Sequence, residues 1–228
     1  MNAAAPTDPA PDATAAAALE RLRLEFNGWQ ERGKGESMAR HHRAITAHAL
    51  ERMQLRPGDR ALDLGCGSGW ATRLLADRVG PTGTAVGVDV SDAMIAEAQA
   101  PAPPPHVRFL CAPAEHVPMP DASFTHVLSV ENFYYYPDQL TVLHELRRLL
   151  APGGRIFLLM CLFTGNPNAK TWAAGLRVPV HLLSAADYRE MLTGDGWTDV
   201  RVEVSKPSIF ARNPDDHSYA CLAVGQKA

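Results

Sequence analysis

From about residue 55 to residue 162, short apolar runs alternate with segments whose apolar residues recur at helical spacing. The apolar runs are "RALDLG", "TAVGVDV", "VRFLCA", "ASFTHVLSV" and "RIFLLMCLF", and each has the length of a buried strand. Three other segments have helical spacing: "GWATRLLADRVG", "DAMIAEAQA" and "PDQLTVLHELRRLLAPGG", the last expected to end at 152–154. Strands that are apolar throughout and alternate with helices predict an α/β fold with a doubly wound parallel sheet.

The two ends of the chain have different patterns. Residues 1–15, rich in Ala, Pro, Asp and Thr, are expected to be a disordered tail. Helical spacing follows from Thr14 to Arg23 and again from about Glu36 to Met53, and the glycines at 28, 33 and 35 predict a loop between these helices. After the fifth strand, residues 163–183 are irregular, and a helix that starts at Ser184 precedes two late strands. We therefore expect one domain, residues 16–228, with an N-terminal helical addition over about 16–54.

Composition and charge exclude several classes of protein. The chain has 228 residues with 22 basic and 25 acidic side chains and a net charge of −3, so neither nucleic acid nor an anionic membrane is an expected partner. No apolar run approaches the ~20 residues of a membrane span. The four cysteines form no CxxC pair and the spacing of His41, His42 and His48 is not that of metal ligands, so no metal site is expected. Unpaired thiols are typical of a reducing compartment, which predicts a cytoplasmic protein.

A glycine-rich turn follows the first predicted strand. Gly65, Gly67 and Gly69 alternate, Asp63 comes just before them, and Asp89 ends the second strand. Ligands of open parallel sheets lie at such turns, beside the N-terminus of the next helix. A dinucleotide is one candidate, which leaves a nicotinamide-dependent oxidoreductase open, although the GxGxG spacing departs from the dinucleotide fingerprint. An acid at Asp63 suits a ligand with a positive group.

The stretch "ALDLGCGSGWA" resembles the first motif of class I S-adenosylmethionine-dependent methyltransferases. The segments "CAPAEHVPMPDASFTHVLSVENFYYYPDQ" and "ELRRLLAPGGRIFLL" are similar to later motifs of the same family, in its ubiquinone/menaquinone-type small-molecule subgroup. The resemblance implies a seven-stranded Rossmann-like sheet whose last strand is antiparallel and inserted beside the fifth. Two positions depart from the family pattern: Pro113 and Thr125 replace its usual aspartates.

The same resemblance implies S-adenosylmethionine as the cofactor and assigns residues to it. The glycine turn would surround its amino-acid part, and Asp89 would accept hydrogen bonds from both ribose hydroxyls. Apolar contacts to the adenine come from Val90 and Met94. The full predicted set is Asp63, Gly65, Cys66, Gly67, Gly69, Asp89, Val90, Met94, Ala114, Glu115 and Ser129.

The implied function is methyl transfer to a small-molecule acceptor. The methylated atom (oxygen, nitrogen, sulfur or carbon) and the oligomeric state stay open, as does a non-catalytic S-adenosylmethionine-binding partner subunit. Three residues are candidates for the acceptor side: Glu131 and Tyr134, just after the fourth strand, and His181 in the insertion over 163–183. Phe26 and Trp29, next to glycines, suggest that residues 24–37 form a mobile lid.

Overall fold

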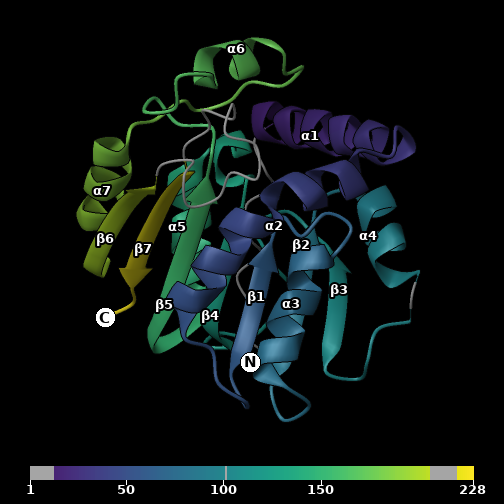
Figure 1. Cartoon of the computed structure of the whole chain (residues 1–228), viewed down its shortest axis with the longest axis vertical. Coiled ribbons are helices and arrows are strands. Elements are labelled where there is room, and N and C mark those ends of the chain that lie inside the picture. The colour runs from purple at the N-terminus through teal and green to yellow at the C-terminus, as the bar shows by residue number, and fades with distance from the viewer. Residues whose placement is uncertain (1–12, 101, 206–219) are drawn as a thin grey trace, which may run out of the picture.

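The computed structural model describes residues 13–100, 102–205 and 220–228, and their strands form one seven-stranded sheet (Figure 1). The strands are β1 Arg60–Leu64, β2 Thr84–Asp89, β3 Val107–Cys111, β4 Phe124–Val130, β5 Leu150–Met160, β6 Thr198–Ser205 and β7 Ala220–Gln226. The helices are α1 Ala13–Glu31, α2 Lys34–Met53, α3 Trp70–Val79, α4 Asp92–Gln99, the 3-10 turn η1 Phe133–Tyr135, α5 Gln139–Leu149, α6 Ala169–Ala174 and α7 Ala185–Gly194.

The strand order is β3-β2-β1-β4-β5-β7-β6. The first five strands are parallel, and β7 is antiparallel to both of its neighbours, β5 and β6. The predicted fold class is confirmed, including the antiparallel last strand beside the fifth. The order reverses at β1, so the turn after β1 lies where an open α/β sheet binds its ligands.

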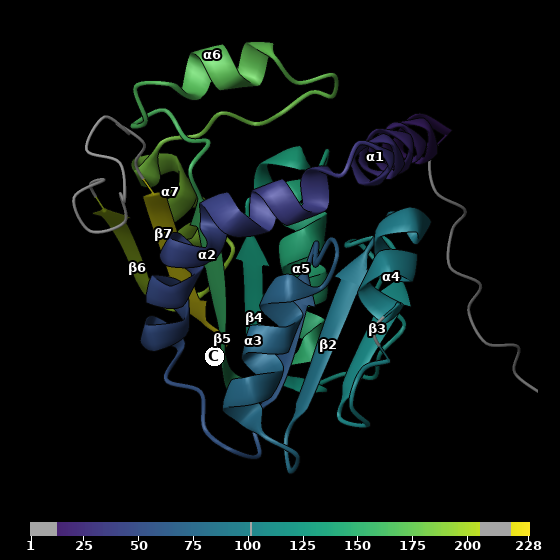
Figure 2. The same ribbon diagram turned by 45° about the vertical axis from the view of Figure 1, so that its right-hand side comes forward.

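Helices cover both faces of the sheet, and each face has its own apolar core. Side chains of α2, α3 and α4, among them Leu50, Leu75 and Ile95, form one core with the strands. Side chains of α5 and α7, among them Leu146 and Tyr188, form the other. The central strands β1 and β2 are mainly apolar because both of their faces are buried, whereas β6 at the sheet edge has no buried position and carries polar side chains. In Figures 1 and 2, α1 lies across the end of the sheet at which the parallel strands finish.

The structure corrects the predicted loop between the first two helices. Residues 24–31 continue α1, and α2 already begins at Lys34, so only the short link at 32–33 is not helical. Gly33 breaks the chain because its φ is +64°, whereas Gly28 stays helical within α1. A helical glycine costs only about 1 kcal/mol, and the buried Leu22 offsets that cost by packing in the core.

Two further boundaries differ from the prediction. The helix expected to end at 152–154 ends at Leu149, because Leu150 turns to an extended conformation and pairs with Phe124 of β4. The segment 163–183, expected to be irregular, contains the short helix α6. Of the predicted tail, residues 1–12 lie outside the described residues and residues 13–15 belong to α1. No helix among the described residues is long and apolar enough to span a membrane.

Candidate active site

The turn between β1 and α3 is formed by three glycines with left-handed backbone conformations. The φ angles are +72° at Gly65, +51° at Gly67 and +79° at Gly69, a region that costs other L-residues roughly 1–2 kcal/mol. A Cβ at Gly65 would collide with the Asn132 side chain. A Cβ at Gly69 would collide with the Phe109 ring, whereas one at Gly67 would meet no atom within 4 Å. Packing therefore requires glycine at two positions, and Gly67 borders open space.

Asp89 connects this turn to the end of β2. One carboxylate oxygen accepts the Gly67 N–H at 2.8 Å, and the other accepts the Ser91 N–H at 2.8 Å. Burial raises the pKa of the Asp89 carboxyl, and these backbone hydrogen bonds oppose that rise. Each oxygen has a further lone pair, so the carboxylate can also accept two hydrogen bonds from a ligand.

Asp63, the acid before the glycines, is almost completely buried. The hydroxyl of Thr72 donates to its carboxylate at 2.6 Å. Burial raises the pKa of Asp63 to about 7; the hydrogen bond from Thr72 opposes this rise, and the negative charge of Asp89 adds to it. The Asp63 carboxyl is thus poised between its neutral and charged forms near neutral pH, and a cationic ligand group nearby would favour the charged form.

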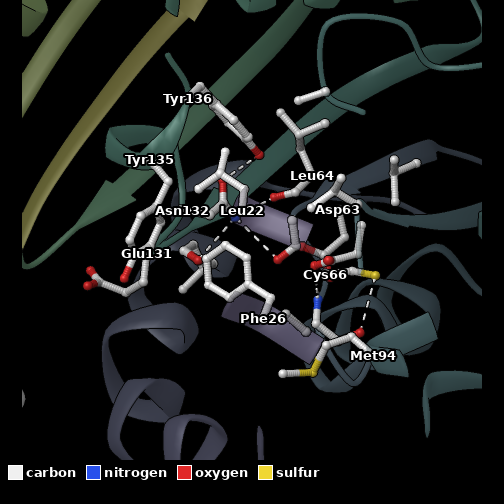
Figure 3. Close-up of a pocket in the computed structure, with 18 of the residues that line it drawn as sticks. Leu22, Phe26, Asp63, Leu64, Cys66, Met94, Glu131, Asn132, Tyr135 and Tyr136 are labelled. Atoms are coloured by element: carbon white, nitrogen blue, oxygen red, sulfur yellow. Dashed lines mark hydrogen bonds between the residues drawn. The ribbon is translucent and has the colours of Figure 1, made fainter. Parts of the chain in front are cut away.

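A single cavity extends from the glycine turn to the aromatic side chains of α1 and η1 (Figure 3). Its volume is about 1030 Å³ when the space open to solvent at its mouth is included. At one end, the turn and the residues after β2 and β3 line it. At the other end, Phe26 and Tyr135 lie close together, with ring centroids 5.1 Å apart. Figure 3 shows Glu131 beside Tyr135 on this side of the cavity and Cys66 and Met94 on the opposite side.

Glu115 lines the cavity at the end near β3. One of its carboxylate oxygens is buried and has no hydrogen-bond partner among the described residues. Burial raises the pKa of the Glu115 carboxyl. A buried acceptor without a partner is costly, and it indicates that an N–H or O–H of a ligand completes this part of the site.

Glu131 is held in an unusual conformation at the aromatic end. Its φ is +57°, which is rare for a side chain of this size. Its backbone N–H donates to Leu159 of β5 at 2.8 Å, and its carboxylate accepts the backbone N–H of Cys161 and, at 3.0 Å, the Tyr134 hydroxyl. The sheet and these donors hold the strained residue in place, an arrangement that is frequent at functional sites. His42 of α2 lies beside it, with Nε2 4.0 Å from a Glu131 oxygen.

Ten of the fourteen residues predicted for the site line this cavity. They are Asp63, Gly65, Cys66, Gly67, Asp89, Val90, Met94, Ala114, Glu115 and Glu131. Of the remaining four, Gly69 packs at the start of α3 and Ser129 is buried, donating to Asn132 at 2.6 Å. Neither residue lines the cavity, but Ser129 holds Asn132, which does.

The other two predicted residues, Tyr134 and His181, do not reach the cavity. The Tyr134 ring is buried, and its hydroxyl contacts Glu131 rather than open space. His181 lines a separate, smaller pocket of about 400 Å³, which shares Leu22 and Tyr135 with the main cavity. Neither side chain is therefore placed to touch a ligand bound beside the glycine turn.

Several lining residues were missed by the sequence prediction. Asn132 follows Glu131 and donates to the carbonyls of Leu64 and Gly65 at 2.5 and 3.2 Å, which ties the end of β4 to the turn. Its position inside the resembling segment could have indicated it. The others lie mainly on α1, α2, α3 and η1: Leu19, Leu22, His42, Trp70, Tyr135 and Tyr136. No local pattern identifies most of these, because tertiary packing brings them to the cavity.

Comparison with known proteins identifies the domain. The family described as "Methyltransferase domain" matches residues 62–158. The chain is 35% identical over 132 residues to the demethylmenaquinone methyltransferase of Geobacillus stearothermophilus, covering 57% of this chain and 55% of that protein. Residues 62–158 thus match a methyltransferase domain, and together with the sheet order they support a class I S-adenosylmethionine-dependent methyltransferase. It spans about half the length of the curated relatives that it matches.

Solved structures support the assignment of this methyltransferase domain. One chain from the complex between the Haloferax volcanii Trm112 methyltransferase activator and the putative methyltransferase is 29% identical, with a TM-score of 0.77 over 89% of this chain and 97% of that one. Geranyl diphosphate C-methyltransferase from Streptomyces coelicolor shares the fold at 17% identity, with a TM-score of 0.67 over 83% of this chain and 80% of that one. The predicted family is therefore confirmed.

The cavity of the methyltransferase domain fits S-adenosylmethionine, the cofactor of this family. The carboxyl of Asp63 can bind a cationic amino-acid group, and the Asp89 carboxylate can accept hydrogen bonds from a diol. The Glu115 oxygen that has no partner among the described residues can accept a further hydrogen bond from the ligand. The prediction of this cofactor is confirmed at the level of the family. Within the described part of the chain, no group of three His, Cys, Asp or Glu side chains could hold a metal ion.

Proposed function

We propose that this chain transfers a methyl group from S-adenosylmethionine to a small, largely apolar acceptor. The observation that carries the proposal is one continuous cavity with two chemically different ends. The glycine turn with Asp63 and Asp89 lines the end that suits the cofactor. Aromatic and aliphatic side chains line the other end, which leaves room for a second, apolar molecule in the same enclosure.

The residues of the chain have to bind, orient and shield, because the sulfonium of the bound cofactor supplies the reactive methyl group. The turn and Asp89 fix the position of the cofactor. Leu22, Phe26 and Tyr135 form an apolar wall that orients the acceptor and keeps water out. The proposal needs no metal and no covalent intermediate on the protein.

The chemistry of the acceptor follows from the walls of its end of the cavity. Leu19, Leu22, Phe26, Trp29 and Tyr135 present mainly carbon to this space, so the acceptor has a flat or hydrocarbon body. The curated relatives carry the name demethylmenaquinone methyltransferase, which makes quinols one class of acceptor to test. None of Cys66, Cys111, Cys161 and Cys221, all within the described residues, forms a disulfide, which supports the expectation of a reducing, cytoplasmic location.

The N-terminal helices are proposed to act as the cover of the site. Leu22 and Phe26 of α1 and His42 of α2 contribute to the cavity wall. On its other side α1 is attached to the start of α4, where Arg23 pairs with Asp92 at 2.8 Å. A cover held by a few polar contacts can open to admit ligands and close before methyl transfer.

The experiment is a turnover assay that measures S-adenosylhomocysteine formed from S-adenosylmethionine by mass spectrometry. The acceptor panel contains quinols, simple phenols, short-chain acids and primary amines, and NAD in place of the cofactor serves as the control. We expect product with an apolar member of the panel. Tight binding of NAD combined with no binding of S-adenosylmethionine would favour the oxidoreductase and overturn the proposal.

A further inference from the structure

The carboxylate of Glu131 lies at the end of the cavity proposed for the acceptor, and its hydrogen bonds leave one side of it accessible to a further group. One oxygen of Glu131 accepts the backbone N–H of Cys161, and the other accepts the Tyr134 hydroxyl at 3.0 Å. The second oxygen also faces Nε2 of His42, 4.0 Å away. Because the strained backbone of Glu131 is fixed to β5, the carboxylate cannot turn away from this histidine without breaking its two hydrogen bonds, from Cys161 and Tyr134.

His42 is the imidazole that lines this cavity among the described residues. Its Nε2 faces Glu131, whereas its Nδ1 has no hydrogen-bond partner in the described part of the chain. A carboxylate beside one nitrogen favours the tautomer with the proton on that nitrogen, which leaves the lone pair on the other. In hydrolase triads a carboxylate likewise sets the tautomer of the histidine, there through a hydrogen bond to Nδ1.

Burial keeps the ring of His42 neutral at neutral pH. Burial lowers the pKa of His42, the negative charge of Glu131 raises it in part, and His41 on the same helix lowers it. Tyr134 and Tyr135, on the η1 side, are uncharged at neutral pH because burial raises the pKa of both hydroxyls. A neutral imidazole can accept a proton, and the adjacent carboxylate stabilises the imidazolium that results.

We propose that His42 removes the proton of a hydroxyl-bearing acceptor during methyl transfer, and that Glu131 is the positioning residue of His42. The acceptor O–H bond breaks, and its proton goes to the free ring nitrogen. The electron pair left on oxygen forms the new bond to the methyl carbon, while the bond between that carbon and sulfur breaks and leaves a neutral thioether. The proton then returns to solvent. This inference rests on the proposed function.

The first test needs neither cofactor nor acceptor. The histidine ring signals of the full chain are titrated by NMR, with the His42 signal assigned from its absence in His42→Gln. In the wild type we expect His42 to titrate below pH 6.5. In Glu131→Gln the midpoint should fall further, by about one pH unit, because the imidazolium loses its carboxylate. Glu131→Asn should give the same shift, and asparagine tolerates the left-handed backbone if glutamine does not.

A matched control comes from the other end of α2. His48 also lies 4.0 Å from a carboxylate oxygen, that of Glu203 on β6, so Glu203→Gln removes a carboxylate beside the same helix and should leave the His42 midpoint unchanged. An identical His42 midpoint in the wild type and both Glu131 variants would overturn the pairing. A His42 ring that is cationic at pH 7 would overturn its role as base.

The second test uses the acceptor found in the turnover assay. His42→Gln should lower kcat on the order of 10²-fold or more, with the affinity for S-adenosylhomocysteine unchanged within about twofold, since the base acts only on the acceptor. Full kcat in His42→Gln would refute the role of His42. If the wild type does not bind S-adenosylmethionine, the proposed function is refuted instead. The NMR titration still decides whether Glu131 and His42 are paired.

Discussion

Asp63 allows a test of the site through its effect on stability. The folded chain holds the pKa of this carboxyl at about 7, whereas the ordinary value is 3.8. Between these values the unfolded chain has already released the proton that the folded chain keeps, so the free energy of unfolding falls as pH rises. From pH 5 to pH 8 the Asp63 carboxyl alone lowers it by about 2–3 kcal/mol, because each pH unit in the window is worth about 1.4 kcal/mol. Asp63→Asn removes this loss.

The assay is urea unfolding of wild type and Asp63→Asn at pH 5 and pH 8. From pH 5 to pH 8, the free energy of unfolding of the variant should rise by about 2–3 kcal/mol relative to that of the wild type. A destabilisation by the amide that is the same at both pH values cancels in this comparison. Thr72 can still donate to the amide oxygen, so the fold should persist. The variant should also bind S-adenosylmethionine more weakly at pH 8, because the cationic amino group loses its carboxylate. Equal stability differences at both pH values would refute the reasoning.

Three further predictions concern the turn, the ribose acid and the cover. Asp89→Ala should weaken S-adenosylmethionine binding by about 2–3 kcal/mol in calorimetry, the scale of lost charge-assisted hydrogen bonds; unchanged affinity would contradict the assignment, and Asp77→Ala, at an exposed acid of α3, is the control. Gly67→Ala should abolish S-adenosylmethionine binding, because the new Cβ enters the cavity. The control is Gly80→Ala, which introduces similar backbone strain at φ +65° in open space and should bind the cofactor normally. Asn27 of α1 is hydrogen-bonded to Asp92 at 2.9 Å and to Ser91 at 2.6 Å, so Asn27→Ala should speed amide hydrogen exchange in α1. In the wild type, binding of cofactor and acceptor together should slow this exchange. Equally strong protection of α1 in all states would show a static cap.

The parallel part of the sheet could be predicted from sequence because most positions of β1, β2, β4 and β5 are buried and therefore apolar. The two N-terminal helices were also predicted, but not their extension over residues 24–31, because that continuity depends on distant contacts. Gly28 weakens a helix locally, but Leu22 and Phe26 pack against the core and the cavity and keep α1 intact. Only Gly33, with its left-handed backbone, ends it. A local pattern of glycines does not distinguish these two cases.

The candidate cofactor half of the site could also be predicted from the sequence, because Gly65, Gly67 and Asp89 belong to short motifs at the ends of adjacent strands. The acceptor half was predicted only in part, since Glu131 lines the cavity but Tyr134 and His181 do not. The run of three tyrosines illustrates why: η1 directs Tyr135 and Tyr136 toward the cavity and turns Tyr134 to Glu131. The direction of each ring depends on the turn, which the residue types do not reveal. His42 comes from a helix about 90 residues earlier in the chain, and only the fold brings it to Glu131.

The central claim is that the glycine turn and Asp89 hold S-adenosylmethionine beside an acceptor space. The most direct test is calorimetric titration of the full chain with S-adenosylhomocysteine, the demethylated cofactor, compared with NAD and with Asp89→Ala. We predict saturable binding of about one S-adenosylhomocysteine per chain, strong weakening in Asp89→Ala, and no heat with NAD. Absence of S-adenosylhomocysteine binding in the folded wild type, or tight binding of NAD at the same site, would contradict the account.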